Sequence, residues 1–451
     1  MSGPGRSLSR ALGTAGRSPW PVRVFAVDDI SAQVTWAASP AAGLRLCLGG
    51  QVVHPKASPP AELWLSALAD LGLGWAELGF GGAVLSGRRR LDPAWPAGPG
   101  AAVFTGLTAG TRYELVASAE GMAPFVAATF STLPTPGGTL LSQFATVSDV
   151  HIGEKHFGVA GRIHDPFGPV VGAPAGAGSA GSAGSAGSAT YPERALQAAL
   201  EEAVEWGAEL IVAKGDLTRF TTAAEMRDVG RLLAACPVPV EAILGNHDNQ
   251  LGVDGKAVLA SQGIQVTWRP RARDLPGVRL VVAESDHRDP RQHKGELPAD
   301  ISREAVALAA KAPSRAGVWM CTHHPPELHW WPVAHPKGIP HRESRALLDL
   351  LAAVKPGALV TAGHRHRNRR YQYGPLVVSE VGSTKDYPGV WAGYRVFEGG
   401  LVQTVRRVSS PDVIAWTEAT RRAMNGQWGR WSPGRLEDRC FSVRWGDGGF
   451  S

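Results

Sequence analysis

The sequence has few cysteines and no closely spaced cysteine pair. Its four cysteines, Cys47, Cys236, Cys321 and Cys440, lie far apart along 451 residues. This spacing argues against a disulfide framework and against a zinc site built from thiolates. A reducing compartment fits this usage best, so we expect a cytoplasmic protein.

Long apolar runs are also missing. The nearest candidate, 63–84, is interrupted by Asp70 and Glu77. We therefore predict no transmembrane segment, because a span needs about 20 apolar residues. The first 20 residues contain arginines but no continuous apolar core, so they make a poor signal peptide. We expect a disordered tail over 1–20.

No compositional bias places the chain among disordered proteins. Hydrophobic residues make up 44% and charged residues 19%, which is typical of a globular protein with room for two or three domains. The net charge of +6 suits an anionic substrate and equally suits an ordinary basic surface. The densest basic runs, 87–91 and 365–370, are by default solvated faces. Nothing in the sequence defines an oligomeric state.

Residues 21–137 contain short alternating segments separated by glycine and proline, such as "SAQVTWAA" and "RYELVASA". This pattern predicts an antiparallel β-sandwich. The stretch "LTAGTRYELVASAEG", followed by "ATFSTLP", resembles the end of a fibronectin type III domain, with Tyr113 in the position of its corner tyrosine. An apolar segment near 64–71 is expected as a helix within a loop.

Residues 140–408 alternate apolar strands with helical segments, which predicts an α/β fold. The segment "PERALQAALEEAVEWG" has helical spacing, with Pro192 in its first turn and Gly207 beyond its end. The Gly/Ala/Ser repeat at 172–189 could suggest a dinucleotide loop, but no strand precedes it, so we expect a flexible insert. Residues 409–451 form a C-terminal extension, for which a helix and a strand packed on the core are expected.

Five apolar strands of this region each end in polar residues of the metal-binding kind. These are Asp149 and His151; Asp216; Asn246, His247 and Asp248; His323 and His324; and His364 and His366. Because binding sites of open α/β sheets collect at the carboxyl ends of strands, the five groups are expected to converge. Carboxylate and imidazole ligands without thiolates suit Mn²⁺, Fe²⁺ or Zn²⁺. The glycines before three of the groups, Gly215, Gly245 and Gly363, permit a sharp turn.

The ordered motifs Asp-x-His, Gly-Asp, Gly-Asn-His-Asp, His-His-Pro and Gly-His-x-His resemble the calcineurin-like metallophosphoesterase superfamily over about 140–385. The resemblance implies an αββα sandwich and two metal ions (Mn²⁺, Fe²⁺ or Fe³⁺, or Zn²⁺) that clamp a phosphoryl group. One ion would be held by Asp149, His151, Asp216 and His366. The other would be held by Asn246, His323 and His364, with Asp216 bridging both.

Two residues of the Gly-Asn-His-Asp motif stay off the metals in this resemblance. His247 would protonate the leaving group. Asp248 would orient His247 and raise the pKa of its ring. His323 is preferred to His324 as the ligand because the family's metal histidine lies two positions before the proline.

The segments "THHPP" and "ESDHRDPRQHKGELPADI" resemble bacterial cyclic-nucleotide and glycerophosphodiester phosphodiesterases. We therefore expect a hydrolase of phosphoric esters, a phosphodiesterase, acting on a small phosphoester. A purple acid phosphatase, a monoesterase, is the alternative that the domain order suggests. Arg219 and His151 stand where that group has tyrosine and glycine.

A nuclease and a catalytically silent metal-binding module also remain open, so nucleic acid is not excluded as a partner. Arg365 and Arg367 would either grip the substrate phosphate or lie solvated. Ser383, Lys385 and Asp386 would line the pocket or form a turn.

Overall fold

A computed structural model describes residues 20–40, 42–55, 97–157, 163–164, 189–250, 253–286, 293–331 and 334–446. Four predictions therefore lie outside the described residues: the tail at 1–20, apart from Trp20; the helix near 64–71; the solvated basic run at 87–91; and the Gly/Ala/Ser insert at 172–189, apart from Ala189. None of the helices in the described ranges combines the length and the apolar character that crossing a bilayer requires.

The N-terminal part forms two small antiparallel sheets, as the alternating pattern predicts. One has the order β1-β2-β5 and the other β4-β3-β6-β7. Inward-facing residues of both sheets, such as Trp36, Phe104 and Leu115, share one buried cluster. The strands are β1 (Arg23–Val27), β2 (Ala32–Trp36), β3 (Arg45–Leu48), β4 (Gln51–Val53), β5 (Gly100–Phe104), β6 (Arg112–Ala119) and β7 (Met122–Ser131).

Tyr113 of β6 makes the contact expected of a corner tyrosine. Its hydroxyl accepts a hydrogen bond from the backbone N–H of Thr108, five residues upstream, at 2.8 Å. The ring stacks on Phe130 of the neighbouring strand. The likeness to a fibronectin type III domain itself remains a prediction.

The rest of the chain contains two six-stranded mixed sheets. The first, in the order β12-β11-β8-β19-β20-β21, is parallel across β12, β11 and β8 and antiparallel beyond. Its strands are β8 (Leu140–Val147), β11 (Ile211–Lys214), β12 (Val240–Ile243), β19 (Val390–Phe397), β20 (Gly400–Arg407) and β21 (Cys440–Arg444).

The second sheet has the order β13-β14-β15-β16-β18-β17, with four parallel strands between two antiparallel edges. Its strands are β13 (Arg271–Leu275), β14 (Val278–Val282), β15 (Gly317–Cys321), β16 (Leu359–Ala362), β17 (Arg369–Tyr373) and β18 (Leu376–Glu380). A separate two-stranded ribbon pairs β9 (His156–Phe157) with β10 (Ile163–His164).

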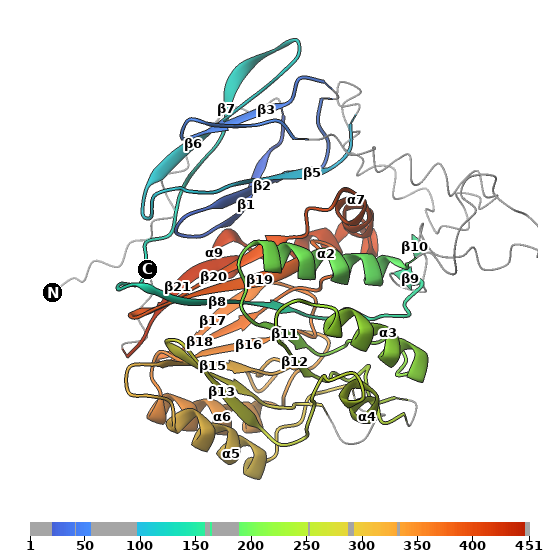
Figure 1. Cartoon of the computed structure of the whole chain (residues 1–451), viewed down its shortest axis with the longest axis vertical. Coiled ribbons are helices and arrows are strands. Elements are labelled where there is room, and N and C mark those ends of the chain that lie inside the picture. The colour runs from blue at the N-terminus through green and yellow to red at the C-terminus, as the bar shows by residue number, and fades with distance from the viewer. Residues whose placement is uncertain are drawn as a thin grey trace, which may run out of the picture.

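The two large sheets face each other across one core and carry helices on their outer faces (Figure 1). Phe144 and Trp319, from opposite sheets, stack at 4.8 Å within this core. Helices α2 (Tyr191–Glu205), α3 (Ala223–Ala234) and α4 (Gly255–Ala260) cover the first sheet, whereas α5 (Ala299–Ala310) and α6 (His341–Val354) cover the second. This is the predicted αββα sandwich, so the predicted fold class is confirmed.

Local sequence signals define the helix that precedes the second motif and the one that follows it. In α2, Leu196 and Leu200 face the sheet core, and Gly207 beyond the end takes a φ of 104° that favours glycine. Helix α3 begins at a capping box, in which Thr222 accepts from the N–H of Glu225 and Glu225 accepts in return from the N–H of Thr222.

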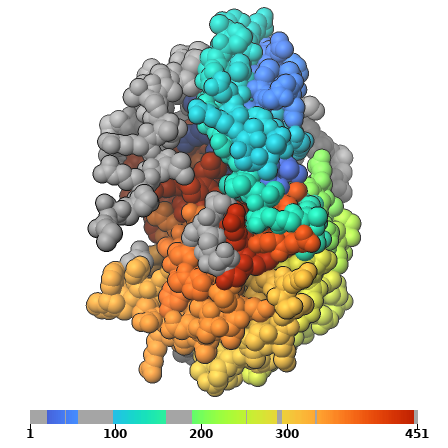
Figure 2. All heavy atoms as spheres, turned by 90° about the vertical axis from the view of Figure 1, so that its left-hand side faces the viewer, coloured from blue at the N-terminus to red at the C-terminus, as the bar shows by residue number. Residues whose placement is uncertain are grey.

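The C-terminal extension packs on the first sheet beside the N-terminal sandwich. It contains α7 (Pro411–Thr420), a short 3-10 turn, η4 (Met424–Gly426), α8 (Trp428–Trp431), α9 (Leu436–Arg439) and then β21. Ion pairs join the sandwich to β19 and β20: Arg406 to Asp28 at 2.8 Å and Arg395 to Asp29 at 3.0 Å. In Figure 2 the blue and cyan sandwich lies directly above the orange and red C-terminal strands.

Candidate metal centre

The predicted ligands come from both large sheets. The motifs follow β8, β11 and β12 of the first sheet and β15 and β16 of the second, all of them parallel strands. Because the carboxyl ends of these strands meet at the same end of the sandwich, polar groups far apart in sequence come together there. We call this cluster the candidate metal centre.

Seven carboxylate and imidazole groups fall into two sets, within each of which the potential ligand atoms lie within 4.8 Å of one another. The first set is Asp149, His151, Asp216 and His366, and the second is His323, His324 and His364. Asp216 faces both sets. Its Oδ2 lies 3.6 Å from His151 Nε2, and its Oδ1 lies 3.3 Å from His323 Nε2.

Asn246, the remaining predicted ligand, is buried in the turn after β12. Its neighbour Gly245 approaches Asp216 and His323 so closely that an added Cβ would collide with both side chains. The Asn246 Oδ1 atom is buried and has no hydrogen-bond partner among the described residues. All seven residues predicted as ligands are therefore found at this end of the sandwich.

The glycines that precede the motifs lack a Cβ, and this allows neighbouring side chains of the site to pack against their backbone. Only Gly215 has a left-handed backbone, with φ of 79°. At Gly215 a Cβ would lie 2.6 Å from the His323 ring, and at Gly363 it would collide with Ser148. Close approach, more than the expected sharp turn, explains Gly245 and Gly363.

Five of the predicted ligand residues have a left-handed backbone conformation. Asp149, His151, Asp216, His364 and His366 have φ values of 53°, 54°, 48°, 68° and 48°. Such conformations are uncommon outside glycine and cluster at functional sites. Bonds between motifs hold them: His151 N–H donates to the Asp216 carbonyl at 2.9 Å, and His364 N–H donates to Asp149 Oδ1 at 2.9 Å.

Most ligand histidines use one ring nitrogen for the protein and leave the other for the centre. His323 Nδ1 lies 2.7 Å from the Lys214 carbonyl, and His366 Nδ1 lies 2.6 Å from Asp386 Oδ2. His364 is held through Nε2, which lies 3.1 Å from the Lys337 carbonyl. Such contacts fix the ring orientation and tautomer of metal-binding histidines.

The opposite nitrogens are among the buried polar atoms of the described residues that lack a hydrogen-bond partner. His323 Nε2, His364 Nδ1 and both ring nitrogens of His151 have no hydrogen-bond partner in the described part of the chain. Buried polar atoms are otherwise almost always paired. The donor set therefore fits metal ions, which would satisfy these atoms together with Asn246 Oδ1.

Charge supports the same conclusion. Burial lowers the pKa of His151 and of His364 well below the ordinary value, so both rings are neutral and keep a lone pair. Burial also disfavours a charged His323, but the carboxylates of Asp216 and Asp149 and the Lys214 carbonyl together outweigh it and raise the pKa of His323 to about 10. A metal ion at His323 Nε2 would gain the same attraction.

His247 lies beside the first set, with its ring 4.6 Å from that of His151. Its Nδ1 lies 2.8 Å from Arg219 Nη1, which can only donate, and 3.1 Å from the Arg219 carbonyl oxygen, which can only accept. Nδ1 therefore ties the ring to Arg219 in either tautomer. Burial lowers the pKa of His247, which agrees with a neutral ring.

Asp248 does not have the expected contact with the His247 ring. Its carboxylate instead accepts from the N–H groups of Leu217, Thr218 and Gly245 and from the Thr218 hydroxyl, at 2.7–2.9 Å. Burial and the nearby Asp216 raise the pKa of Asp248 to about 7. The expectation that Asp248 orients His247 and raises its pKa is therefore corrected: Asp248 ties the second motif to the third, and Arg219 contacts the ring.

The basic residues around the fifth motif are neither solvated nor directed at a substrate. Arg365 and Arg367 are 3% and 5% exposed. Arg365 pairs with Glu327 and, at 2.8 Å, with Glu380, and Arg367 also pairs with Glu380. Both expectations for these arginines are wrong because buried carboxylates already hold them.

Sequence reasoning missed several residues around the centre. His324 belongs to the second set, and its Nδ1 lies 3.2 Å from Ser285 Oγ. Asp386 holds His366 and itself accepts from Trp428 Nε1 at 3.1 Å. Only His324 had a signal, since it stands beside the chosen histidine; the segment containing Asp386 was otherwise expected as a turn or pocket wall.

The fold and site thus define an αββα sandwich with a candidate metal centre. No family model matches the chain, and a search of curated proteins found no match. Among solved structures, the chain resembles purple acid phosphatase PPD1 from yellow lupin seeds, with 12% identity, a TM-score of 0.39, and coverage of 88% of this chain and 73% of that one.

Two further solved structures show distant likenesses as well. PhoD has 9% identity and a TM-score of 0.36, covering 88% of this chain and 89% of its own. The phosphoesterase YfcE from E. coli has 13% identity and a TM-score of 0.28, covering 59% of this chain and 95% of its own. At such low identities and TM-scores, no activity is carried over to this protein.

Proposed function

We propose that the protein is a metal-dependent hydrolase of phosphoric esters, with phosphodiesters as its preferred substrates. The observation that carries this proposal is the position of Asp216, whose two carboxylate oxygens face different sets of ligands. Two cations held close together need a shared anion between them. Asp216 meets that requirement in a buried site where its charge is strongly felt.

The ligand roles follow from the two sets. Asp149, His151 and His366 would hold one ion, and Asn246, His323 and His364 the other, with Asp216 between them. His324 is a further candidate for the second ion. Two metal ions, when bound, supply Lewis-acid polarisation of a phosphoryl oxygen and activation of water.

The chain's own residues would position the substrate and move its proton. His247 is held by Arg219 through Nδ1, and a proton carried on its Nε2 can be donated to an ester oxygen beside the first set. Preference for diesters rests on "THHPP" and "GEL", which are neighbours in space: a Cβ at Gly295 would lie 2.6 Å from His324 Cβ.

The test compares metal content with hydrolysis in the purified protein. Bis-p-nitrophenyl phosphate should be hydrolysed faster than p-nitrophenyl phosphate, chelation should abolish both activities, and Mn²⁺ should restore them. Asp216→Asn should lose the activity, whereas Asp228→Asn, an exposed carboxylate on α3, should keep it. Full hydrolysis after exhaustive metal removal would contradict a metal-dependent mechanism. A faster monoester reaction would contradict the diester preference alone.

A further inference from the structure

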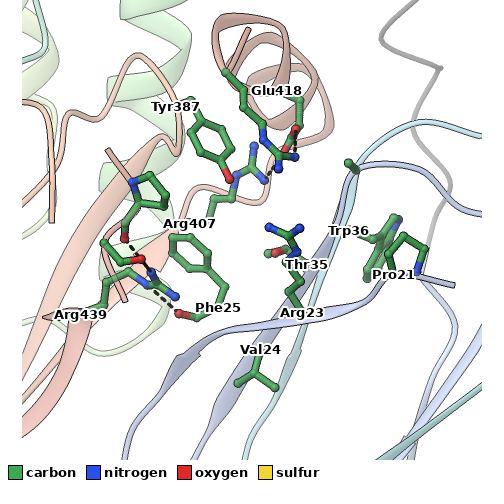
Figure 3. Close-up of a pocket in the computed structure, with 14 residues that line it drawn as sticks. Pro21, Arg23, Val24, Phe25, Thr35, Trp36, Tyr387, Arg407, Glu418 and Arg439 are labelled. Carbon is green, nitrogen blue, oxygen red and sulfur yellow. Dashed lines mark hydrogen bonds and ion pairs between the residues drawn. The ribbon is translucent and has the colours of Figure 1, made fainter. Parts of the chain in front are cut away.

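A second charged cavity lies where the N-terminal sandwich meets the C-terminal extension. It has a volume of about 190 Å³ and is lined by residues of β1 and β2 on one side and of β20, α7 and α9 on the other. We call it the junction cavity (Figure 3). None of the predicted metal ligands lines it.

Arginine dominates the charge of this cavity. Arg23, Arg407, Arg421 and Arg439 line it, and Glu418 is the only carboxylate among the described residues that line it. Glu418 is fully used, because Oε1 pairs with Arg407 at 2.6 Å and Oε2 with Arg421 at 3.3 Å. The Glu418 carboxylate therefore pairs with the guanidinium groups of Arg407 and Arg421. It pairs with neither of the other two lining arginines, Arg23 and Arg439.

Arg439 is buried, and no carboxylate of the described residues pairs with it. It is 6% exposed, and it donates to the carbonyl oxygens of Phe25, Pro433 and Gly434 at 2.6–2.9 Å. The adjacent carboxylate of Asp438 accepts instead from the backbone N–H groups of Arg370 and Arg435. Burial of an uncompensated charge is costly, so Arg439 is a strong candidate to meet an anion.

Arg23 completes the arrangement from the opposite wall. Figure 3 shows its side chain reaching into the cavity from β1, toward the side that carries Arg407. No described residue forms a hydrogen bond or ion pair with its guanidinium group. The Tyr387 ring also lines the cavity, with the guanidinium carbons of Arg407 and Arg421 at 5.1 and 5.3 Å from its centre.

We propose that the junction cavity binds a small oxyanion of at least two negative charges, namely a phosphate group. Guanidinium forks match phosphate oxygens in geometry. Arg407 and Arg439 are buried, whereas Arg23 is exposed. The volume admits a phosphate group with a few atoms attached or a few waters, because a water molecule occupies about 30 Å³ in the liquid. Drug-sized ligands need about 300 Å³ or more. The bound anion would join three segments: β1, the Tyr387 loop and α9.

The probe is inorganic phosphate, added to the full-length, metal-loaded protein and measured by calorimetry and thermal unfolding. Two binding events are expected in the wild type, one at the metal centre and one at the junction cavity. Arg23→Gln should weaken the second event by about tenfold or more, since one charge-assisted contact is lost. Arg45→Gln, an exposed arginine of the same sandwich, should change neither event.

Two further measurements test which form of phosphate binds and how the Glu418 charge affects binding. Glycerol phosphate, compared with inorganic phosphate, shows whether the cavity accepts a phosphate ester or only the free ion. Glu418→Gln should tighten binding, because it removes the competing carboxylate. Equal phosphate binding by the wild type and Arg23→Gln would overturn the proposal. So would sodium chloride at matched ionic strength that stabilises the protein against thermal unfolding as much as phosphate does. Loss of hydrolysis in an Asp216 variant leaves this site untouched, so the two proposals fail separately.

Discussion

The Oδ1 atom of Asp216 lies 3.3 Å from Nε2 of His323, while its Oδ2 atom lies 3.6 Å from Nε2 of His151. The three side chains come from the ends of β8, β11 and β15, so one carboxylate joins ligands of both large sheets. A cation placed against either oxygen feels the same buried charge. This geometry makes Asp216 the residue whose loss should affect both metal positions.

Replacing Asp216 by alanine should therefore remove both metal ions, whereas His151→Ala should mainly weaken one. Elemental analysis of the purified variants measures the stoichiometry directly. The exposed Asp228→Asn control should bind metal as the wild type does. Two equivalents of metal in Asp216→Ala would show that the carboxylate does not bridge.

Asp386 should act through His366. Its Oδ2 atom fixes His366 Nδ1 at 2.6 Å, and Trp428 Nε1 in turn donates to Oδ1. Loss of such an outer partner typically costs about 10–100-fold in metal affinity. Asp386→Ala should show that loss for one metal, and Trp428→Phe a smaller one. Unchanged titration of both metals in Asp386→Ala would exclude this positioning role.

His247→Ala should keep both metals and lose rate in a way that depends on the leaving group. Loss of a general acid costs about 10²–10⁴ in rate and costs more when the departing oxygen is more basic. Hydrolysis of a p-nitrophenyl ester should therefore fall moderately, and that of an alkyl ester severely. An equal loss on both esters would point to phosphate binding by His247 instead.

The buried Arg365 should matter for stability more than for the substrate. Arg365→Ala leaves the carboxylates of Glu327 and Glu380 short of a partner, and breaking a buried pair costs about 3–5 kcal/mol. Urea unfolding measures this change. The control, Arg345→Ala, breaks a pair whose side chains are 60% and 57% exposed and should cost about 0–1 kcal/mol. A stable Arg365→Ala variant with a raised KM would instead assign Arg365 to substrate binding.

In protein stripped of metal by a chelator, Asp286 should make the free energy of unfolding depend on pH. Burial and the nearby Glu284 raise the pKa of Asp286 to about 8, above the value of about 4 expected in the unfolded chain. The folded state therefore binds an extra proton between these values, and the free energy of unfolding should fall as pH rises from about 5 to about 8. Each pH unit contributes at most about 1.4 kcal/mol.

Asp286→Asn should reduce this slope without abolishing it, because the amide stays neutral throughout while Asp248 keeps its own raised pKa. The exposed Asp300→Asn should keep the wild-type slope. Urea unfolding at a series of pH values measures both. A wild-type slope in Asp286→Asn would mean that another group takes up the proton.

The sequence by itself determined the elements and the candidates for the site. Apolar runs that end in ligand-type residues mark five strand ends, and helical spacing with Pro192 and Gly207 defines α2. These signals are short-range: a strand, its turn and the next residues are contiguous, so the pattern carries them without knowledge of the fold. The alternating N-terminal segments predicted a sandwich for the same reason.

Only the tertiary structure decided which partners the side chains have. Trp428 reaches Asp386 across 42 residues and Arg406 reaches Asp28 across 378, and no local pattern encodes such pairs. The sequence could not predict that Asp248 accepts hydrogen bonds from backbone amides of the second motif. It also could not predict that Arg365 and Arg367 are buried and paired with Glu380. Those contacts exist because two sheets and an extension pack together, which brings charges of distant segments into a low-dielectric interior where each must find a partner.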